Sequence, residues 1–373
     1  MKSKIEIIQF LRGIAALLVC CFHMKGILNY DSHSWGTLLF GRGSMGVPLF
    51  FMISGIIMVI TTRSSSSNLA DIRNFYIKRA IRILPLYYIL TFILITGLGI
   101  WRYYLVSHPE YLIKSLLFMP TGTTHIGASY GMPILEVGWS LNFEVFFYFL
   151  LGISMLAGKW RWPFLIMLIL SLVYIVPLVT KGYVMSNASE WYGYSIGYLN
   201  MITNPVMLYF LFGVGVGLLY LSNLINLSSF YIKSLLYIVV INVILFYFGV
   251  YTKVEGYYVG MVIIGFLLLF LLLRDKKQPY KINRHFVWLG DISYSLYLVH
   301  PIVLIFLPRF LKSIGASMLL QTPFYFLVAL SVILFLSYLT YELIENRLSR
   351  KLLFLLTSKD RLQTVEIRVK PSK

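Results

Sequence analysis

Ten apolar runs, each close to 20 residues long, constrain the fold of this chain more than any other feature. A run of that length with few charges can cross the hydrocarbon core of a bilayer as one helix. The runs lie at residues 7–24, 45–62, 83–100, 139–157, 163–180, 203–221, 233–250, 256–273, 286–307 and 323–343. We therefore predict an all-α integral membrane protein with about ten transmembrane helices around a central cavity.

The composition supports this fold class. Of the 373 residues, 59% are hydrophobic and 12% are charged. A soluble domain of this size would cover its apolar side chains with far more charge. A further apolar stretch, from Tyr111 to Met119, is too short to cross the bilayer, so we expect it to lie at the interface or to re-enter.

The basic residues indicate the orientation. The formal net charge is +18, and Lys and Arg in the connections divide roughly three to one between the two sides. This positive-inside pattern predicts that both termini are cytoplasmic, and it explains the charge without a nucleic-acid partner. We expect one membrane domain over residues 1–346 and a basic cytoplasmic tail over residues 347–373 that lies against anionic headgroups.

The first apolar run carries two polar residues, Arg12 and His23. A spacing of eleven residues is about three helical turns, so both side chains lie on one face, roughly 16 Å apart along the axis. Ionisable groups are costly in lipid and normally face a protein interior or a water-filled cavity. The face that carries Arg12 and His23 is therefore predicted to border the central cavity.

Two further ionisable residues are expected near the level of His23. Glu144 lies about five residues below the outer end of the fourth run, and His300 is predicted in the outer half of the ninth. A histidine beside a carboxylate can act as a general base, because the carboxylate fixes the tautomer and stabilises the imidazolium. The alternatives are a buried polar pair that holds helices together and a zinc site built from His23, Glu144 and His300.

A second cluster precedes the third run on the predicted cytoplasmic side. Arg79 and Arg82 are three residues apart and share a helix face, where their planar guanidinium groups would suit phosphate. The alternative is that they only mark the inner side of the membrane. Glu345 at the end of the last run could pair with either arginine, and Ser54, at mid-membrane, is expected either to line the cavity or to pack.

Together these residues resemble the acyltransferase-3 family of membrane O-acyltransferases. The resemblance extends over residues 9 to 345 and rests on motifs that recur in the family order. The motifs are Arg12 with His23, Phe50-Phe51-Met52-Ile53-Ser54-Gly55, Arg79-Ala80-Ile81-Arg82, Trp139-Ser140-Leu141 with Glu144, and Gly290-Asp291-Ile292-Ser293-Tyr294-Ser295-Leu296-Tyr297-Leu298-Val299-His300-Pro301.

The resemblance implies an acyl-CoA donor, such as acetyl-CoA, and a hydroxyl acceptor on a cell-surface glycan such as O-antigen, lipopolysaccharide or exopolysaccharide. It implies a multi-pass protein of the bacterial inner membrane with no metal. His23 would be catalytic, together with Glu144 and Arg12. Donor-binding candidates are Arg79, Arg82, Ser54 and Tyr294, and the additional site candidates are His300, Trp139 and Ser293.

The expected mechanism begins with the phosphates of acetyl-CoA on Arg79 and Arg82. The pantetheine arm would pass Arg12 and bring the thioester to His23, which Glu144 orients. Direct transfer and a covalent acyl-enzyme, for example on Cys20, remain alternatives. Acceptors other than glycans are a small molecule or a lipid headgroup, and a different class of protein would be a proton-coupled transporter.

Two features depart from the family pattern. Many relatives that modify glycans carry an additional periplasmic SGNH-hydrolase domain, and we expect the membrane domain of this chain to meet its glycan directly. The family often has proline after the last glutamate, whereas here Asn346 follows Glu345.

Overall fold

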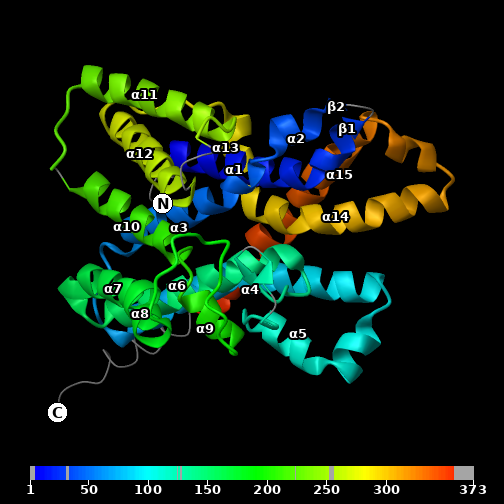
Figure 1. Cartoon of the computed structure of the whole chain (residues 1–373), viewed down its shortest axis with the longest axis horizontal. Coiled ribbons are helices and arrows are strands. Elements are labelled where there is room, and N and C mark those ends of the chain that lie inside the picture. Colours follow the sequence, from blue (N-terminus) through cyan, green and yellow to red (C-terminus); the bar gives the residue numbers. More distant parts are fainter. Residues whose placement is uncertain are drawn as a thin grey trace, which may run out of the picture.

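The computed structural model describes residues 5–30, 33–123, 125–126, 128–222, 224–251 and 256–356 and is dominated by helices (Figure 1). The helices are α1 (Glu6–Met24), α2 (Trp35–Phe40), α3 (Gly46–Thr62), α4 (Leu69–Gly97), α5 (Pro109–Leu116), α6 (Trp139–Met155), α7 (Arg161–Leu170), α8 (Val176–Lys181), α9 (Gly197–Ile202), α10 (Met207–Leu221), α11 (Ser229–Tyr247), α12 (Gly256–Lys277), α13 (Arg284–Asp291), α14 (Ser293–Ser313) and α15 (Phe324–Thr340). Among the short 3₁₀ and π segments are η1 (Lys25–Leu28), η3 (Tyr103–Ser107), η4 (Glu136–Gly138), η6 (Ser171–Ile175) and η8 (Tyr341–Leu348).

Within this described part of the chain, ten helical segments are long and apolar enough to cross a membrane, which confirms the predicted all-α membrane fold. They are Glu6–Leu28, Trp35–Thr62, Leu69–Gly97, Glu136–Met155, Gly158–Lys181, Gly197–Leu221, Ser229–Tyr247, Tyr258–Lys277, Ser293–Ser313 and Phe324–Leu356. Of the predicted basic tail, residues 347–356 continue the last helix, and residues 357–373 lie outside the described residues.

Four short strands form two small antiparallel hairpins in the loops. In the first, β1 (Asn29–Tyr30) pairs with β2 (His33–Ser34), and Asn29 lies opposite Ser34. In the second, β3 (His125–Ile126) pairs with β4 (Ser129–Tyr130), and His125 lies opposite Tyr130.

Helices α1, α3, α10 and α14 form much of the interior, with α1 packed against α13, α14 and α3. Small residues allow the closest contacts. A Cβ on Gly290 of α13 would come within 2.0 Å of the backbone oxygen of Gln9, and a Cβ on Gly55 of α3 within 2.4 Å of the backbone oxygen of Phe210. Lipid gives helices no hydrophobic reason to associate, so close van der Waals packing at glycines contributes more than in water.

One predicted span begins later than expected. The apolar run at 286–307 is divided between α13 and α14, which meet at Ile292, and the spanning helix is Ser293–Ser313. The break follows Gly290 and Asp291, two poor helix formers. His300 is therefore seven residues after the start of a 21-residue helix. Its ring meets that of His23 near the end of α1, in agreement with the predicted common level of the two histidines.

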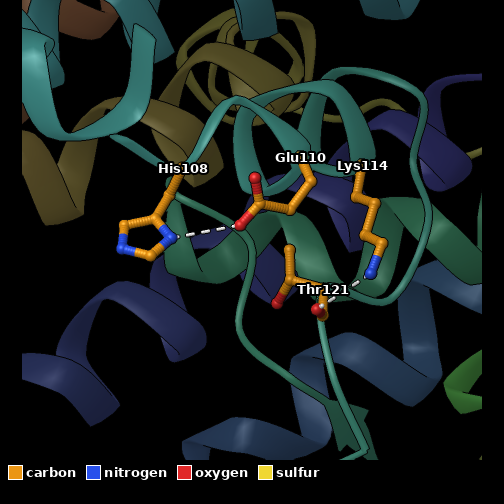
Figure 2. A network of polar contacts seen from close by, with 4 residues as sticks. All are labelled: His108, Glu110, Lys114 and Thr121. Atoms are coloured by element: carbon orange, nitrogen blue, oxygen red, sulfur yellow. Dashed lines mark hydrogen bonds and ion pairs between the residues drawn. The ribbon is translucent and has the colours of Figure 1, made fainter. Parts of the chain in front are cut away.

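Other helices lie at the edges of the molecule, outside this interior group. In Figure 1, α11 and α12 run side by side at one edge, whereas α5 lies at the opposite edge beside α4. The short stretch expected not to cross the membrane forms α5. The hydroxyl of Tyr88 on α4 donates a hydrogen bond to the backbone oxygen of Leu116 on α5 at 2.9 Å. Figure 2 shows the polar contacts around α5, where His108 Nδ1 lies 3.1 Å from Glu110 Oε1 and Lys114 Nζ donates to the backbone oxygen of Thr121.

Candidate active site

A cavity of about 50 Å³ lies among α1, α3, α4, α6 and α14. It has room for a few water molecules, which need 10–15 Å³ each, and it is much smaller than a sugar or a cofactor arm. Its walls are largely aromatic and aliphatic, with polar groups from each helix. The lining residues are Arg12, Val47, Phe50, Phe51, Ile53, Ser54, Ile57, Met58, Arg82, Ser140, Leu141, Glu144, Tyr148, Ser293, Tyr294 and Tyr297.

Two charged side chains of this cavity, Arg12 and Glu144, are hydrogen-bonded to neutral side chains. Arg12 is 9% exposed, and its Nη1 donates to Gln9 Oε1 at 3.2 Å. Glu144 accepts hydrogen bonds from Ser54 Oγ (3.2 Å) and from the hydroxyl of Tyr148. Arg82 and Glu144 lie within electrostatic range of Arg12. Buried charges are expensive unless they are paired or solvated by hydrogen bonds, so this set indicates a polar ligand or water in the cavity.

Glu345 lies next to this charged set, at its end on the predicted cytoplasmic side. It accepts hydrogen bonds from the hydroxyl and the backbone N–H of Ser295, the latter at 3.0 Å, and it lies within electrostatic range of Arg82 and Arg12. The prediction placed Glu345 beside Arg79 or Arg82, and all three line one groove. Its hydrogen bonds, however, are with Ser295, so they join η8 to the first turn of α14.

That groove opens on the predicted cytoplasmic side and has a volume of about 310 Å³. It is lined by Lys78, Arg79, Ile81, Arg82, Glu345, Ser349, Arg350 and Leu353. Arg82 borders both the groove and the cavity, so one guanidinium group lies at the junction of the two spaces.

Arg79 is the least satisfied polar group of the groove. Its buried Nε and Nη1 have no hydrogen-bond partner among the residues that the structure describes. Its guanidinium lies 5.5 Å from the ring centroid of Tyr148 and 5.9 Å from that of Phe75. Leaving a buried charged donor unpaired costs a few kcal/mol, on the order of the desolvation penalty of the group. Acceptor atoms of a bound ligand would remove that cost.

His23 and His300 form a second polar centre. His23 Nδ1 lies 2.9 Å from the backbone oxygen of Val19 and 3.3 Å from His300 Nε2, and the ring centroids are 5.0 Å apart. His300 is fully buried and its Nδ1 lies 3.1 Å from the backbone oxygen of Leu296, whereas His23 is exposed.

These contacts assign the tautomers of the two neutral rings. A carbonyl oxygen can only accept, so His300 carries its hydrogen on Nδ1 and its Nε2 is an acceptor. The Nδ1–H of His23 is then shared between Val19 and His300 Nε2. The lone pair of His23 Nε2 remains available, on the exposed ring, to take a proton.

Tyr297 separates the two centres. Its hydroxyl lies 2.7 Å from Ser140 Oγ and donates to the backbone oxygen of Val137 at 3.0 Å. Its ring packs 5.9 Å from that of Phe50 and 6.0 Å from that of His300. Tyr297, Ser140 and Phe50 line the cavity while the two histidines do not, so this aromatic partition lies between them.

The expected pair of Glu144 with His23 is wrong. The ring of His23 meets His300, and Glu144 faces Ser54, Tyr148 and the arginines. The proposed zinc set is divided in the same way, and no group of three metal-binding side chains was found among the described residues. The sequence places Glu144 on its helix but does not specify how that uniformly apolar helix is rotated.

The other predicted site residues divide into two groups. Ser54, Ser293 and Tyr294 line the cavity, and the Tyr294 hydroxyl donates to the backbone oxygen of Ile83 at 2.8 Å. Trp139 does not border the cavity, and its ring lies 6.2 Å from that of Phe143. Cys20 is buried and its thiol lies 3.7 Å from Met24 Sδ.

Two tyrosines of the site were missed. Tyr148 follows Glu144 by four residues and therefore shares its helix face, a spacing from which it could have been found. Tyr297 follows Ser293 by four residues, but nothing in the sequence indicates that its hydroxyl reaches α6.

The sequence is similar to that of known proteins. The family model described as "Acyltransferase domain", that of acyltransferase-3, matches residues 5–342. "Exopolysaccharide production protein ExoZ" of Rhizobium meliloti (strain 1021) is 37% identical over 138 residues, which cover 36% of this chain and 41% of that protein.

A second relative covers more of the chain. "Putative acetyltransferase ORF330" of Acidianus two-tailed virus is 26% identical over 310 residues, which cover 78% of this chain and 80% of the relative. No solved structure matches the chain. Because the family model extends over nearly all of the sequence, the chain belongs to the acyltransferase-3 family of membrane proteins and is an acyltransferase.

Proposed function

We propose that this protein transfers an acetyl group from cytosolic acetyl-CoA to a hydroxyl of a cell-surface glycan, such as exopolysaccharide or O-antigen, in a bacterial inner membrane. The observation that carries the proposal is Arg79, whose unpaired buried donors line a groove that meets the internal cavity at Arg82. The name of the ExoZ relative supports a polysaccharide acceptor, and that of the viral relative supports an acetyl group.

The groove suits the phosphate groups of the donor. Arg79 and Arg82 present planar guanidinium groups, and Lys78 and Arg350 add charge at its edge. From there the pantetheine arm would enter the cavity past Arg82 and reach Arg12. A cavity of about 50 Å³ is too small for that arm, so donor binding requires the helices around it to separate.

The histidine pair supplies the base. His23 Nε2 takes the proton of the acceptor hydroxyl, the oxygen attacks the thioester carbonyl carbon, and the carbon–sulfur bond breaks to release the thiolate of CoA. That thiolate takes up the proton from His23. His300 acts as a positioning residue, because its Nε2 holds the Nδ1–H of His23 and keeps the reactive nitrogen unprotonated.

Arg12 acts on the donor and not on the acceptor in this proposal. About three turns of α1, roughly 16 Å, separate it from His23, a length comparable to the pantetheine arm. Glu144, held by Ser54 and Tyr148, balances the charge of Arg12 and Arg82 while the cavity is empty of donor. The acyl group must then pass Tyr297 to reach His23.

The experiment measures the O-acetyl content of surface polysaccharide in cells that carry the wild-type protein, His23→Ala or no protein. His108→Ala is the matched control, since His108 is a histidine near α5, outside both polar centres. We expect acetylation with the wild type and the control and none with His23→Ala at equal membrane abundance. Full acetylation by His23→Ala would refute the base, and no acetylation of glycan by the wild type would favour a small-molecule or lipid acceptor.

A further inference from the structure

A cleft between the ends of α11 and α12 lies apart from the active site. Its lining comes from the first turn of α11 and the last turns of α12, namely Ser229, Ile232, Lys233, Arg274, Lys277 and Gln278. None of these residues borders the cavity or the groove described above. The cleft holds about 10 Å³, enough for one oxygen-sized group, on the predicted cytoplasmic side.

Three cations from two helices converge on this cleft, and no carboxylate lines it. Lys233 and Lys277 are exposed, and neither forms a hydrogen bond or an ion pair with the residues that the structure describes. The nearby carboxylate of Asp275 accepts from the backbone N–H of Tyr280 (2.8 Å). The cleft therefore has a concentrated positive charge that no lining carboxylate neutralises.

Arg274 is held in place. Its Nη1 donates to the backbone oxygen of Gln278 at 2.7 Å, and its guanidinium lies 3.9 Å from the ring centroid of Tyr280. The N-terminus of α11, which starts at Ser229 and is capped by the side chain of Ser228, adds a positive dipole end to the same place. A positive-inside bias explains basic residues at this level, but it does not require them to converge or one of them to be stacked.

The surface next to the cleft is apolar. In α11 only Ile232 and Phe246 are buried, and its outward residues include Phe230 (72% exposed), Tyr237 (69%) and Ile241 (56%). Such a helix faces lipid when it spans a membrane. A ligand of this region would thus meet positive charge at the membrane surface and an apolar helix below it.

We propose that this cleft binds the phosphate of an anionic phospholipid whose acyl chains lie along α11. Basic pockets between transmembrane helices on the cytoplasmic side are suited to anionic headgroups. A soluble anion would use the three cations but not the apolar face of α11. The site is distinct from that of the acyl donor, and it does not depend on the proposed acceptor.

The test uses the full-length protein, purified in a neutral detergent and stripped of lipid. Binding of phosphatidylglycerol is counted by native mass spectrometry and compared with that of phosphatidylcholine. The variant Lys233→Gln/Arg274→Gln/Lys277→Gln should bind phosphatidylglycerol more weakly, by about tenfold or more, since each cation near the surface contributes to such binding. The single variant Lys233→Glu, which repels phosphate, should weaken it as well if the triple variant does not fold.

The matched control removes three other cations of the same side, Arg63, Lys159 and Lys351, by substitution with glutamine, because none of them lines the cleft. It should bind phosphatidylglycerol as the wild type does. Equal losses in the two triple variants would show a diffuse charge effect and overturn the proposal. So would unchanged binding by the cleft variants, or displacement of phosphatidylglycerol by millimolar inorganic phosphate alone, which would indicate a site for soluble anions.

Discussion

The charged cavity and the histidine pair are both polar centres inside an apolar bundle, but they are built differently. In the cavity, side chains hold the charged groups. Arg12 is held by Gln9 of its own helix, and Glu144 by Tyr148 of its own helix and by Ser54 of α3. In the histidine pair, backbone oxygens within α1 and α14 orient the two rings. The first centre can change shape when these side chains change rotamer, whereas each ring of the second is held by the backbone of its own helix.

This difference matches a division of the reaction into two tasks. A centre made of long charged side chains can adapt to a donor that enters and leaves. A centre made of two rings fixed to their own helices can keep one nitrogen ready for proton transfer. The following substitutions test that division. Each assay uses purified protein with acetyl-CoA, and the readout is acetylated glycan in all but the last, which measures hydrolysis of acetyl-CoA.

Removal of the base should have the largest effect. For His23→Ala we expect kcat to fall by about 10²–10⁴, the usual contribution of general base catalysis, with the KM for acetyl-CoA nearly unchanged. Steady-state kinetics over a range of acetyl-CoA concentrations measures both constants. A large rise in KM with an unchanged kcat would move His23 to the donor-binding half of the site.

Removal of the shared arginine should act on the donor. Arg82→Gln deletes charge-assisted hydrogen bonds to the donor, so the KM for acetyl-CoA should rise by about 10- to 100-fold. Lys159→Gln is the matched control, because Lys159 is an exposed cation that lines neither space. If Arg82→Gln lowered kcat alone, the assignment of tasks to the two centres would have to be reversed.

His300 offers a smaller and more diagnostic change. His300→Ala removes the acceptor of the Nδ1–H of His23, and the loss of about one hydrogen bond should lower kcat by about five- to tenfold. His300→Gln can present an amide oxygen at the same place and should restore part of the rate. The pH dependence of kcat should change in the Ala variant and return toward that of the wild type in the Gln variant; equal rates and profiles in both variants would leave His300 with a packing role.

The partition between the centres should give the smallest effect on transfer. Tyr297→Phe removes the hydrogen bonds to Ser140 and Val137, so we expect hydrolysis of acetyl-CoA without acceptor to rise by a few-fold as water reaches the thioester. Tyr325→Phe is the matched control, since the buried Tyr325 hydroxyl has no hydrogen-bond partner within the described part of the chain. No change in hydrolysis with Tyr297→Phe would mean that its hydroxyl does not keep water out.

The transmembrane helices were predictable because the length and the hydropathy of each span can be read directly from the sequence. The exception at 286–307 arose because Phe286, Val287, Trp288 and Leu289 extend the apolar run of α14 backwards, and only Gly290 and Asp291 indicate the break. Of the predicted site residues, Arg12, Arg82, Ser54 and Tyr294 do meet in one cavity, whereas Arg79 lines the adjoining groove.

Partners across helices were less predictable. Helix α6 is apolar on nearly all sides, so no amphipathic pattern specifies which neighbour Glu144 faces. The contact of His23 with His300 depends on how α14 lies against α1. Gly13 of α1 closely approaches Gly290 of α13, just before α14 begins. Such contacts arise from the packing of one helix against another, so the sequence pattern of a single helix does not predict them.

Helix α1 runs without a break from Glu6 to Met24 and carries Arg12 at one level and His23 at another. The distance between Arg12, where we propose that the donor is held, and His23, where we propose that a proton is taken, is therefore set by the number of residues between them. One residue inserted between the two would turn His23 by about 100° relative to Arg12 and lengthen the interval by about 1.5 Å. In the proposed mechanism, the number of residues between Arg12 and His23 therefore sets the length of donor that fits.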